Sequence, residues 1–267
     1  MNNILYNVFS PKLGIYLKIS PIAFKIGHFY VHWYGIIIAL GFLLGFLYIS
    51  RRAHEFGLNQ NDVTDFALIA SICGILGARI YYVIFYPSNF YKENLIKIFI
   101  IPEGGIAIYG AIIGGFLGVL VLAKIKKKNL CSVLDLMSLG LIIGQTVGRW
   151  GNFVNQEAFG TETTLPWGMM SENTFFKIVH PCFFYESLGC FACFLFLHFY
   201  SLKIKYKPGN IFLIYTMLYG LLRALIEGLR TDSLILPGTF IRVSQLLSII
   251  LFISSIALLI SGRHLKK

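Results

Sequence analysis

An arginine, two asparagines and a glutamate stand close together in the segment 148–160, GRWGNFVNQEAFG. The guanidinium of Arg149 can bind a phosphodiester through two parallel hydrogen bonds, and the amides of Asn152 and Asn155 add neutral donors. Glu157 can orient that arginine or accept a proton. Asparagine and glycine also end helices, so the same residues can be caps and interfacial anchors. From the residues alone, an anion site and a structural role both stay open.

A second charged group follows nearer the C-terminus. Arg223, Glu227 and Arg230 are spaced by four and three residues, which predicts that they share one face of a helix. Charges near a helix end can simply reach the headgroup zone, but an arginine-glutamate-arginine face favours burial in a bundle. We expect Arg230 to be a second phosphate ligand.

Four further polar side chains stand in or beside apolar runs. An unpaired Arg79 would cost about 3 kcal/mol at the centre of a bilayer, so it needs a partner or a wet cavity. Glu186 is expected to pair with an arginine or to be protonated. Tyr109, among closely spaced glycines, can bind a substrate or only pack. Tyr34 either belongs to an aromatic belt or reaches the site.

The elements that position these residues are predicted to be membrane helices. Of 267 residues, 57% are hydrophobic and 13% are charged, about half the charged share of a soluble domain. Apolar runs that approach or exceed the length needed to span a bilayer lie at 29–49, 63–86, 105–123, 132–148, 182–201, 210–229 and 242–261. We expect an all-α polytopic bundle of about seven transmembrane helices. No linker or repeat divides residues 1–267, which indicates one domain.

The basic residues alternate between connections. They follow the first, third, fifth and seventh runs, as Arg51 and Arg52; Lys124, Lys126, Lys127 and Lys128; Lys203, Lys205 and Lys207; and Arg263, Lys266 and Lys267. The positive-inside rule makes these connections cytoplasmic, with the N-terminus outside and the C-terminus inside. The outer segment 149–181 then carries the polar cluster. A net charge of +11 without one basic stripe does not indicate nucleic acid.

On these residues the sequence resembles the prolipoprotein diacylglyceryl transferase family, whose signature G-R-x-[GA]-N-F-x-N-x-E-x-x-G is matched at 148–160. The resemblance also covers WYG at 33–35, GARIYY at 77–82, the glycine-rich third run, the segment 180–186 and the charged group at 223–230. It implies a bacterial inner-membrane enzyme with its active site towards the outer face. Neither a metal nor a cofactor is implied.

The reaction that the resemblance implies moves the diacylglyceryl group of phosphatidylglycerol to the lipobox cysteine of a prolipoprotein. A thioether forms, glycerol-1-phosphate leaves, and lipoprotein maturation begins; membrane lipids are the other expected partners. Arginines in a water-poor site would stabilise the charge on the departing phosphate. The expected catalytic residues are Tyr109, Arg149, Glu157 and Arg230. The expected substrate-binding residues are Tyr34, Arg79, Arg149, Asn152, Asn155, Gly160 and Glu227, of which Gly160 allows a turn.

The proton acceptor stays open. The substrate thiol, with an ordinary pKa of about 8.5, must lose its proton before it attacks. Many family members carry histidine where Tyr109 stands, and tyrosine, with a pKa near 10, is a poor base unless arginines lower that pKa. Glu157 is the alternative acceptor.

Two other classes of protein remain as alternatives. A transporter or flippase would also have charges within its spans, but it should show corresponding broken segments in two halves. The odd number of spans and the polar clusters at one face favour the enzyme. A lipid-binding scaffold that has lost activity would explain the change at Tyr109, but the complete signature argues against it.

Overall fold

The computed structural model of the chain describes residues 6–86, 90–99, 104–203, 207–236 and 238–262. Within these ranges, seven helices are long and apolar enough to cross a membrane. They are α1 Trp33–Arg52, α2 Gln60–Phe85, α4 Ile108–Ile125, α5 Leu130–Asn155, α6 Cys182–Lys203, α7 Asn210–Glu227 and α8 Val243–Ser261. The prediction of a helical multi-pass membrane bundle is confirmed. The orientation of the termini stays a prediction, and Lys205, Arg263, Lys266 and Lys267 lie outside the described residues.

The chain divides into two compact units. Unit 1 comprises Met1–Tyr48 and Asp135–Lys267, and unit 2 comprises Ile49–Leu134. The boundaries fall inside α1 and α5, so no Pro/Gly-rich linker in the sequence marks them. The single domain expected from the sequence stays a prediction.

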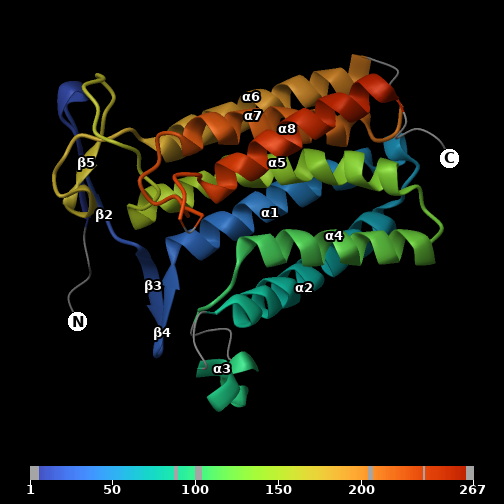
Figure 1. The fold of residues 1–267 in the computed structure, drawn as a ribbon, viewed down its shortest axis with the longest axis horizontal. Helices are drawn as coiled ribbons and strands as arrows, with labels where there is room; N and C mark the ends of the chain where they lie inside the picture. Colours follow the sequence, from blue (N-terminus) through green and yellow to red (C-terminus); the bar gives the residue numbers. More distant parts are fainter. Residues whose placement is uncertain (1–5, 87–89, 100–103, 204–206, 237, 263–267) are drawn as a thin grey trace. The chain divides into compact units, whose positions relative to one another are not determined.

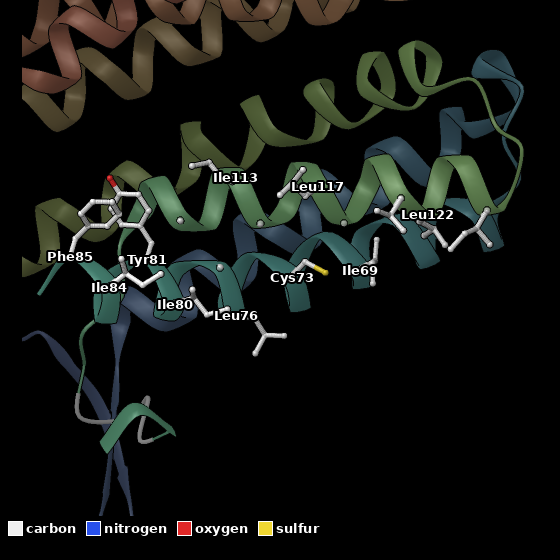
Figure 2. Close-up of a pocket in the computed structure, with 16 residues that line it drawn as sticks. Ile69, Cys73, Leu76, Ile80, Tyr81, Ile84, Phe85, Ile113, Leu117 and Leu122 are labelled. Atoms are coloured by element: carbon white, nitrogen blue, oxygen red, sulfur yellow. The ribbon is translucent and has the colours of Figure 1, made fainter. Parts of the chain in front are cut away.

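In unit 2, α2 and α4 lie side by side through their glycines. A Cβ placed on Gly110 would lie 2.3 Å from the carbonyl oxygen of Gly77, and one placed on Gly114 would lie 2.2 Å from that of Cys73. This confirms the close packing that the glycine spacing predicts. An apolar groove of about 560 Å³ follows the two helices, with Ile80 and Leu117 among its walls (Figure 2). The short helices α3 Phe90–Glu93 and η3 Leu95–Phe99 complete the unit between α2 and α4.

Unit 1 also packs its helices through glycines. A Cβ on Gly45 of α1 would lie 2.6 Å from the carbonyl oxygen of Gly140 on α5, and one on Gly220 of α7 would lie 2.8 Å from that of Ser248 on α8. The helix backbones therefore approach each other closely between α1 and α5 and between α7 and α8.

The start of α7 is held by a side chain from α5. Asp135, which is fully buried, accepts hydrogen bonds from the backbone N–H of Gly209 at 2.6 Å and of Phe212 at 2.8 Å. The first N–H groups of a helix lack partners within the helix, so a carboxylate satisfies them and interacts favourably with the helix dipole. Asp135 thereby fixes the register between α5 and α7.

Five short strands form two small sheets in the described part of unit 1. β1 Tyr6–Ser10, β2 Ile15–Ile19 and β5 Met170–Ser171 make an antiparallel sheet in the order β2-β1-β5, and β3 Ile22–Ile26 pairs with β4 Phe29–His32 as a hairpin. The strands gather at one end of the unit 1 helices (Figure 1). The sequence analysis did not predict them, because runs of two to five residues carry little periodic signal.

Candidate active site

The segment 148–160 is half helix and half loop. Helix α5 continues to Asn155, so Arg149 and Asn152 project from its last two turns. Gln156 and Ala158 then adopt positive φ angles of 53° and 57°, which end the helix. The loop therefore begins only at Gln156. The helical backbone sets the spacing of Arg149 and Asn152 by one turn, which brings both onto one side of α5.

A chain of alternating charges links α5, α6 and α7. Arg149 Nη2 lies 2.5 Å from Glu186 Oε1, and Arg223 Nη1 lies 3.0 Å from Glu186 Oε2. Arg223 Nη2 in turn lies 2.5 Å from Glu227 Oε2. We call these four residues the Arg-Glu network. It confirms that Glu186 pairs with an arginine and that Arg223 and Glu227 share a helix face.

The position of each charge follows from its helix. Glu186 lies one turn into α6, where the partial positive charge of the helix N-terminus favours a carboxylate. Glu227 ends α7, where that dipole is unfavourable, so it depends on Arg223. The last carbonyls of α7 accept hydrogen bonds from side chains at the start of α8, since Gln245 Nε2 donates to Ala224 at 3.0 Å and Arg242 donates to Glu227.

The arginine side chains of the network are more exposed than its glutamate side chains. The side chains of Glu186 and Glu227 are 1% and 2% exposed, whereas those of Arg149 and Arg223 are 22% and 15% exposed. The carboxylates therefore lie behind the guanidiniums. Buried charge of both signs is balanced within the network, as a low-dielectric interior requires.

A polar relay of Arg149, Asn152 and Glu157 extends the network into the loop after α5. We call residues 156–160 the signature loop. Arg149 Nη1 lies 3.4 Å from Asn152 Oδ1, and Asn152 Nδ2 donates to Glu157 Oε1 at 2.9 Å. The backbone N–H of Glu157 also donates to the carbonyl of Asn152 at 3.1 Å. Three predicted site residues are thus brought together. Asn155 is the last residue of α5, and its backbone carbonyl accepts a hydrogen bond from Asn173 Nδ2 at 3.5 Å.

Gly160 joins the signature loop to the segment after α7. Its backbone forms a β-bridge with Arg230. A Cβ at Gly160 would lie 2.8 Å from both Cys182 Sγ and His180 Cβ, so a side chain does not fit. The φ of Gly160 is not positive. Glycine is required here for close approach, and its role in the turn of the loop stays a prediction.

Arg230 lies outside the helical face predicted for it. Because α7 ends at Glu227, Arg230 falls beyond the helix and does not share a face with Arg223. Its Nε and Nη2 donate to the two carboxylate oxygens of Asp232 at 2.9 and 2.6 Å. Burial acts to raise the pKa of Asp232, but the hydrogen bonds and charge of Arg230 outweigh burial and hold that pKa below its usual value.

Tyr34 lies against the signature helix. A Cβ on Gly151 would lie 2.7 Å from Tyr34 Cδ2, so the ring of Tyr34 occupies the space that a side chain at 151 would need. The ring of Tyr34 on α1 therefore packs against the backbone of α5 at Gly151. A role for Tyr34 in the site stays a prediction.

Arg79 and Tyr109 belong to unit 2. The guanidinium of Arg79, which is buried, donates to the backbone carbonyls of Lys97 at 2.5 Å, Ile98 at 2.8 Å, Gly104 at 2.7 Å and Gly105 at 2.8 Å. The predicted need for a partner is confirmed, and the partners are carbonyls. Tyr109 is the second residue of α4, and its ring lies 6.4 Å from that of Tyr81 between centroids. Substrate roles for both residues stay predictions.

The sequence analysis underrated two residues of the network. Arg223 was expected on the shared face and Glu186 as a paired residue, but neither was placed among the site residues. The signal was present, because a glutamate inside an apolar helix must find a cation. What the sequence does not show is which arginine it finds.

Comparison with known proteins agrees with the signature. The profile of the family described as prolipoprotein diacylglyceryl transferase matches residues 21–261. Proteins named phosphatidylglycerol–prolipoprotein diacylglyceryl transferase are similar to this chain. That of Finegoldia magna is 42% identical over 237 residues, 89% of this chain and 93% of that protein. Those of Limosilactobacillus reuteri and Staphylococcus aureus (strain Newman) are 42% identical over 262 residues and 39% over 259, covering 94% and 93% of this chain and 94% and 91% of theirs. The chain belongs to the prolipoprotein diacylglyceryl transferase family.

Proposed function

We propose that the chain transfers the diacylglyceryl group of phosphatidylglycerol to the thiol of a lipobox cysteine in a prolipoprotein. The sulfur forms a bond to the glyceryl carbon, and the bond from that carbon to the phosphate oxygen breaks. The thiol proton passes to a base, and glycerol-1-phosphate leaves. Family membership and the names of the relatives support this activity. The observation that carries it is the Arg-Glu network beside the signature loop.

The first task of the site is to bind a phosphodiester whose charge grows as it leaves. Arg149 and Arg223 are held from behind by Glu186, which leaves their more exposed edges for a ligand. Donors that are fixed before the reaction stabilise developing charge without reorganising. Arg149 is therefore the proposed main phosphate ligand. Arg223 is proposed as a second ligand, because it shares the carboxylate of Glu186 with Arg149.

Arg230 is proposed as an outer ligand. Its guanidinium forms a bidentate ion pair with Asp232, whose side chain is 47% exposed. The backbone of Arg230 forms a β-bridge with Gly160. A phosphate that approaches from outside can compete with an exposed carboxylate more easily than with a buried one. Arg230 would then meet the headgroup first, and Arg149 and Arg223 would hold the phosphate during transfer.

The proposed proton acceptor is Glu157. It is exposed, and Asn152 holds one of its oxygens at 2.9 Å. A carboxylate in this position can take the thiol proton while the relay keeps it near Arg149. Tyr109 is the other candidate. In the pH profile of kcat, Glu157→Gln would remove the acidic limb if the glutamate is the base, whereas Tyr109→Phe would do so if the phenol is.

The proposed location is the bacterial cytoplasmic membrane, with the N-terminus and the active site at the outer face. The alternation of basic connections supports this orientation. Asn152 and Asn155 are proposed to orient the headgroup, and Tyr34 to cover it. The lipobox cysteine would meet the glyceryl carbon beside Arg149.

The test is transfer of label from the diacylglyceryl part of phosphatidylglycerol to a lipobox peptide by the purified chain in detergent. A peptide with serine in place of cysteine controls for the nucleophile. We expect Arg149→Ala to lower kcat by at least about a hundredfold, the usual cost of losing one preorganised donor. Lys177→Ala, which removes an exposed ion pair with Glu162 in the same segment, should leave kcat unchanged. No label from folded protein would overturn the proposal and favour a transporter or scaffold.

A further inference from the structure

The hairpin of β3 and β4 has one face that is entirely apolar. Phe24 stands opposite Val31 and Ile26 opposite Phe29, and residues that face each other across a pair or alternate along a strand share one side. Phe24, Ile26 and Phe29 are 50%, 63% and 80% exposed. A contiguous patch of exposed aromatic and branched side chains marks a surface that binds something.

The opposite face carries a cation. Lys25 stands opposite Tyr30, and its ammonium lies 5.2 Å from the centroid of the tyrosine ring. The ring holds the charge over the hairpin by cation–π attraction. The two faces therefore differ sharply, one apolar and one cationic, over only two short strands.

The hairpin is attached directly to a membrane-spanning helix. β4 ends at His32 and α1 begins at Trp33, whose N–H donates to the carbonyl of Pro21 at 3.0 Å and closes the base of the hairpin (Figure 1). Trp33 is itself 44% exposed, as in the aromatic belts of membrane proteins. The hairpin is thus tied by its backbone to the first turn of a helix long enough to span a membrane.

The chain segment that carries the hairpin has charges of one sign. Residues 6–32 contain Lys12, Lys18 and Lys25 but neither aspartate nor glutamate. The three lysines precede α1, so this part of the chain is complementary to an anionic surface. A two-stranded hairpin is marginally stable by itself in water, and burial of its apolar face in another medium would stabilise it.

We propose that the hairpin of β3 and β4 is an interfacial anchor that lies in the headgroup zone of an anionic bilayer. Phe24, Ile26 and Phe29 insert among the upper acyl chains, and Lys25 meets lipid phosphates. Amphipathic segments with aromatic residues on one side and basic residues on the other bind membrane interfaces in this way. The inference rests neither on the transferase site nor on which side of the membrane the hairpin lies.

The test places the photoreactive amino acid p-benzoylphenylalanine at Phe29 in the full chain, reconstituted in nanodiscs of radiolabelled phosphatidylglycerol and phosphatidylcholine. The matched control places it at Tyr30, the adjacent residue on the opposite face. We expect the variant at Phe29 to label phospholipid at least about fivefold more than the variant at Tyr30, because neighbouring residues of a strand point to opposite sides. The same substitution at Phe24 repeats the measurement at a second position of the apolar face.

Equal labelling at Phe29 and Tyr30 would overturn the proposal. Crosslinking from Phe29 to protein instead of lipid would also overturn the proposal. Crosslinking that appears only with an added lipobox peptide would do so too, since the face would then bind a polypeptide. The charge is tested by Lys25→Gln. When Lys25 is unchanged, lipid labelling by the variant with p-benzoylphenylalanine at Phe29 should rise about fivefold when phosphatidylglycerol is added to phosphatidylcholine nanodiscs. The same variant carrying Lys25→Gln should show no such rise. A rise that persists in Lys25→Gln would overturn the role of the lysine.

Discussion

Removal of the carboxylate at the centre of the Arg-Glu network should destabilise the protein strongly. Glu186→Gln keeps the shape of the side chain but leaves Arg149 and Arg223 without their shared counterion. The ion pairs are 2.5 and 3.0 Å long, and the side chain of Glu186 is 1% exposed. Both guanidiniums would then carry charge in a largely buried place with no nearby compensation from α6.

The expected magnitude follows from two opposing contributions. Charge centres about 4 Å apart attract by about 4 kcal/mol at an effective dielectric constant of 20, and Glu186 has two such partners. The cost of burying the glutamate, several kcal/mol, disappears in the variant and offsets part of that attraction. A net loss of about 3–5 kcal/mol in the free energy of unfolding remains, the usual cost of breaking a buried pair.

The assay is a double-mutant cycle in mixed detergent micelles, with Arg149→Gln, Glu186→Gln and the double variant. The chain offers a matched control, because Lys177 and Glu162 form an ion pair of the same 2.5 Å length with side chains 60% and 66% exposed. We expect a coupling energy of about 2 kcal/mol for the buried pair and below about 1 kcal/mol for the exposed pair. Equal coupling energies would refute the view that burial makes Glu186 the centre of the site.

Three further substitutions test single contacts. Gly160→Ala should lower the free energy of unfolding by about 1–3 kcal/mol, because its Cβ would collide with neighbours at 2.8 Å, whereas Gly35→Ala, with no atom within 4 Å, should be neutral in thermal unfolding. Asp135→Asn should cost about 1–2 kcal/mol, because the amide keeps one acceptor oxygen and turns its NH2 group toward the other backbone N–H, and amide exchange in the first turn of α7 should become faster. Arg79→Lys cannot reach four carbonyls with three donors, so limited proteolysis between residues 97 and 105 should accelerate; unchanged proteolysis would contradict this role.

The helices could be predicted from the sequence because lipid imposes a simple rule. A chain in hydrocarbon must satisfy its backbone within each span, so long apolar runs become helices. The observed helices α2 and α6 begin within three residues of the runs predicted at 63–86 and 182–201. α5 is the exception, since it extends to Asn155 and not to 148, because a helix does not have to stop where apolar residues stop.

The sequence predicts the chemical type of a buried residue's partner but not which residue that partner is. A buried glutamate requires a cation, and the sequence predicts this for Glu186, but the choice of Arg149 and Arg223 depends on how α5, α6 and α7 pack. Arg230 shows the same limit, because the helical spacing from Arg223 holds only while the helix lasts, and α7 ends three residues earlier. Asp232, two residues further on, then becomes the nearer partner.

The balance of charge in the site explains how a bound phosphate could be both held and released. Two arginines and two glutamates make the network neutral, so a phosphodiester brings one negative charge in excess. Arg230 can supply the missing positive charge if the phosphate displaces Asp232, whose side chain is 47% exposed, from the guanidinium. After transfer the departing phosphate carries more charge, but Asp232 then competes for Arg230 from water. In the proposed mechanism the buried carboxylates would keep Arg149 and Arg223 in place throughout, while the exposed pair of Arg230 and Asp232 would open and close. The inner residues would then position the phosphate, and the outer ones would exchange the headgroup.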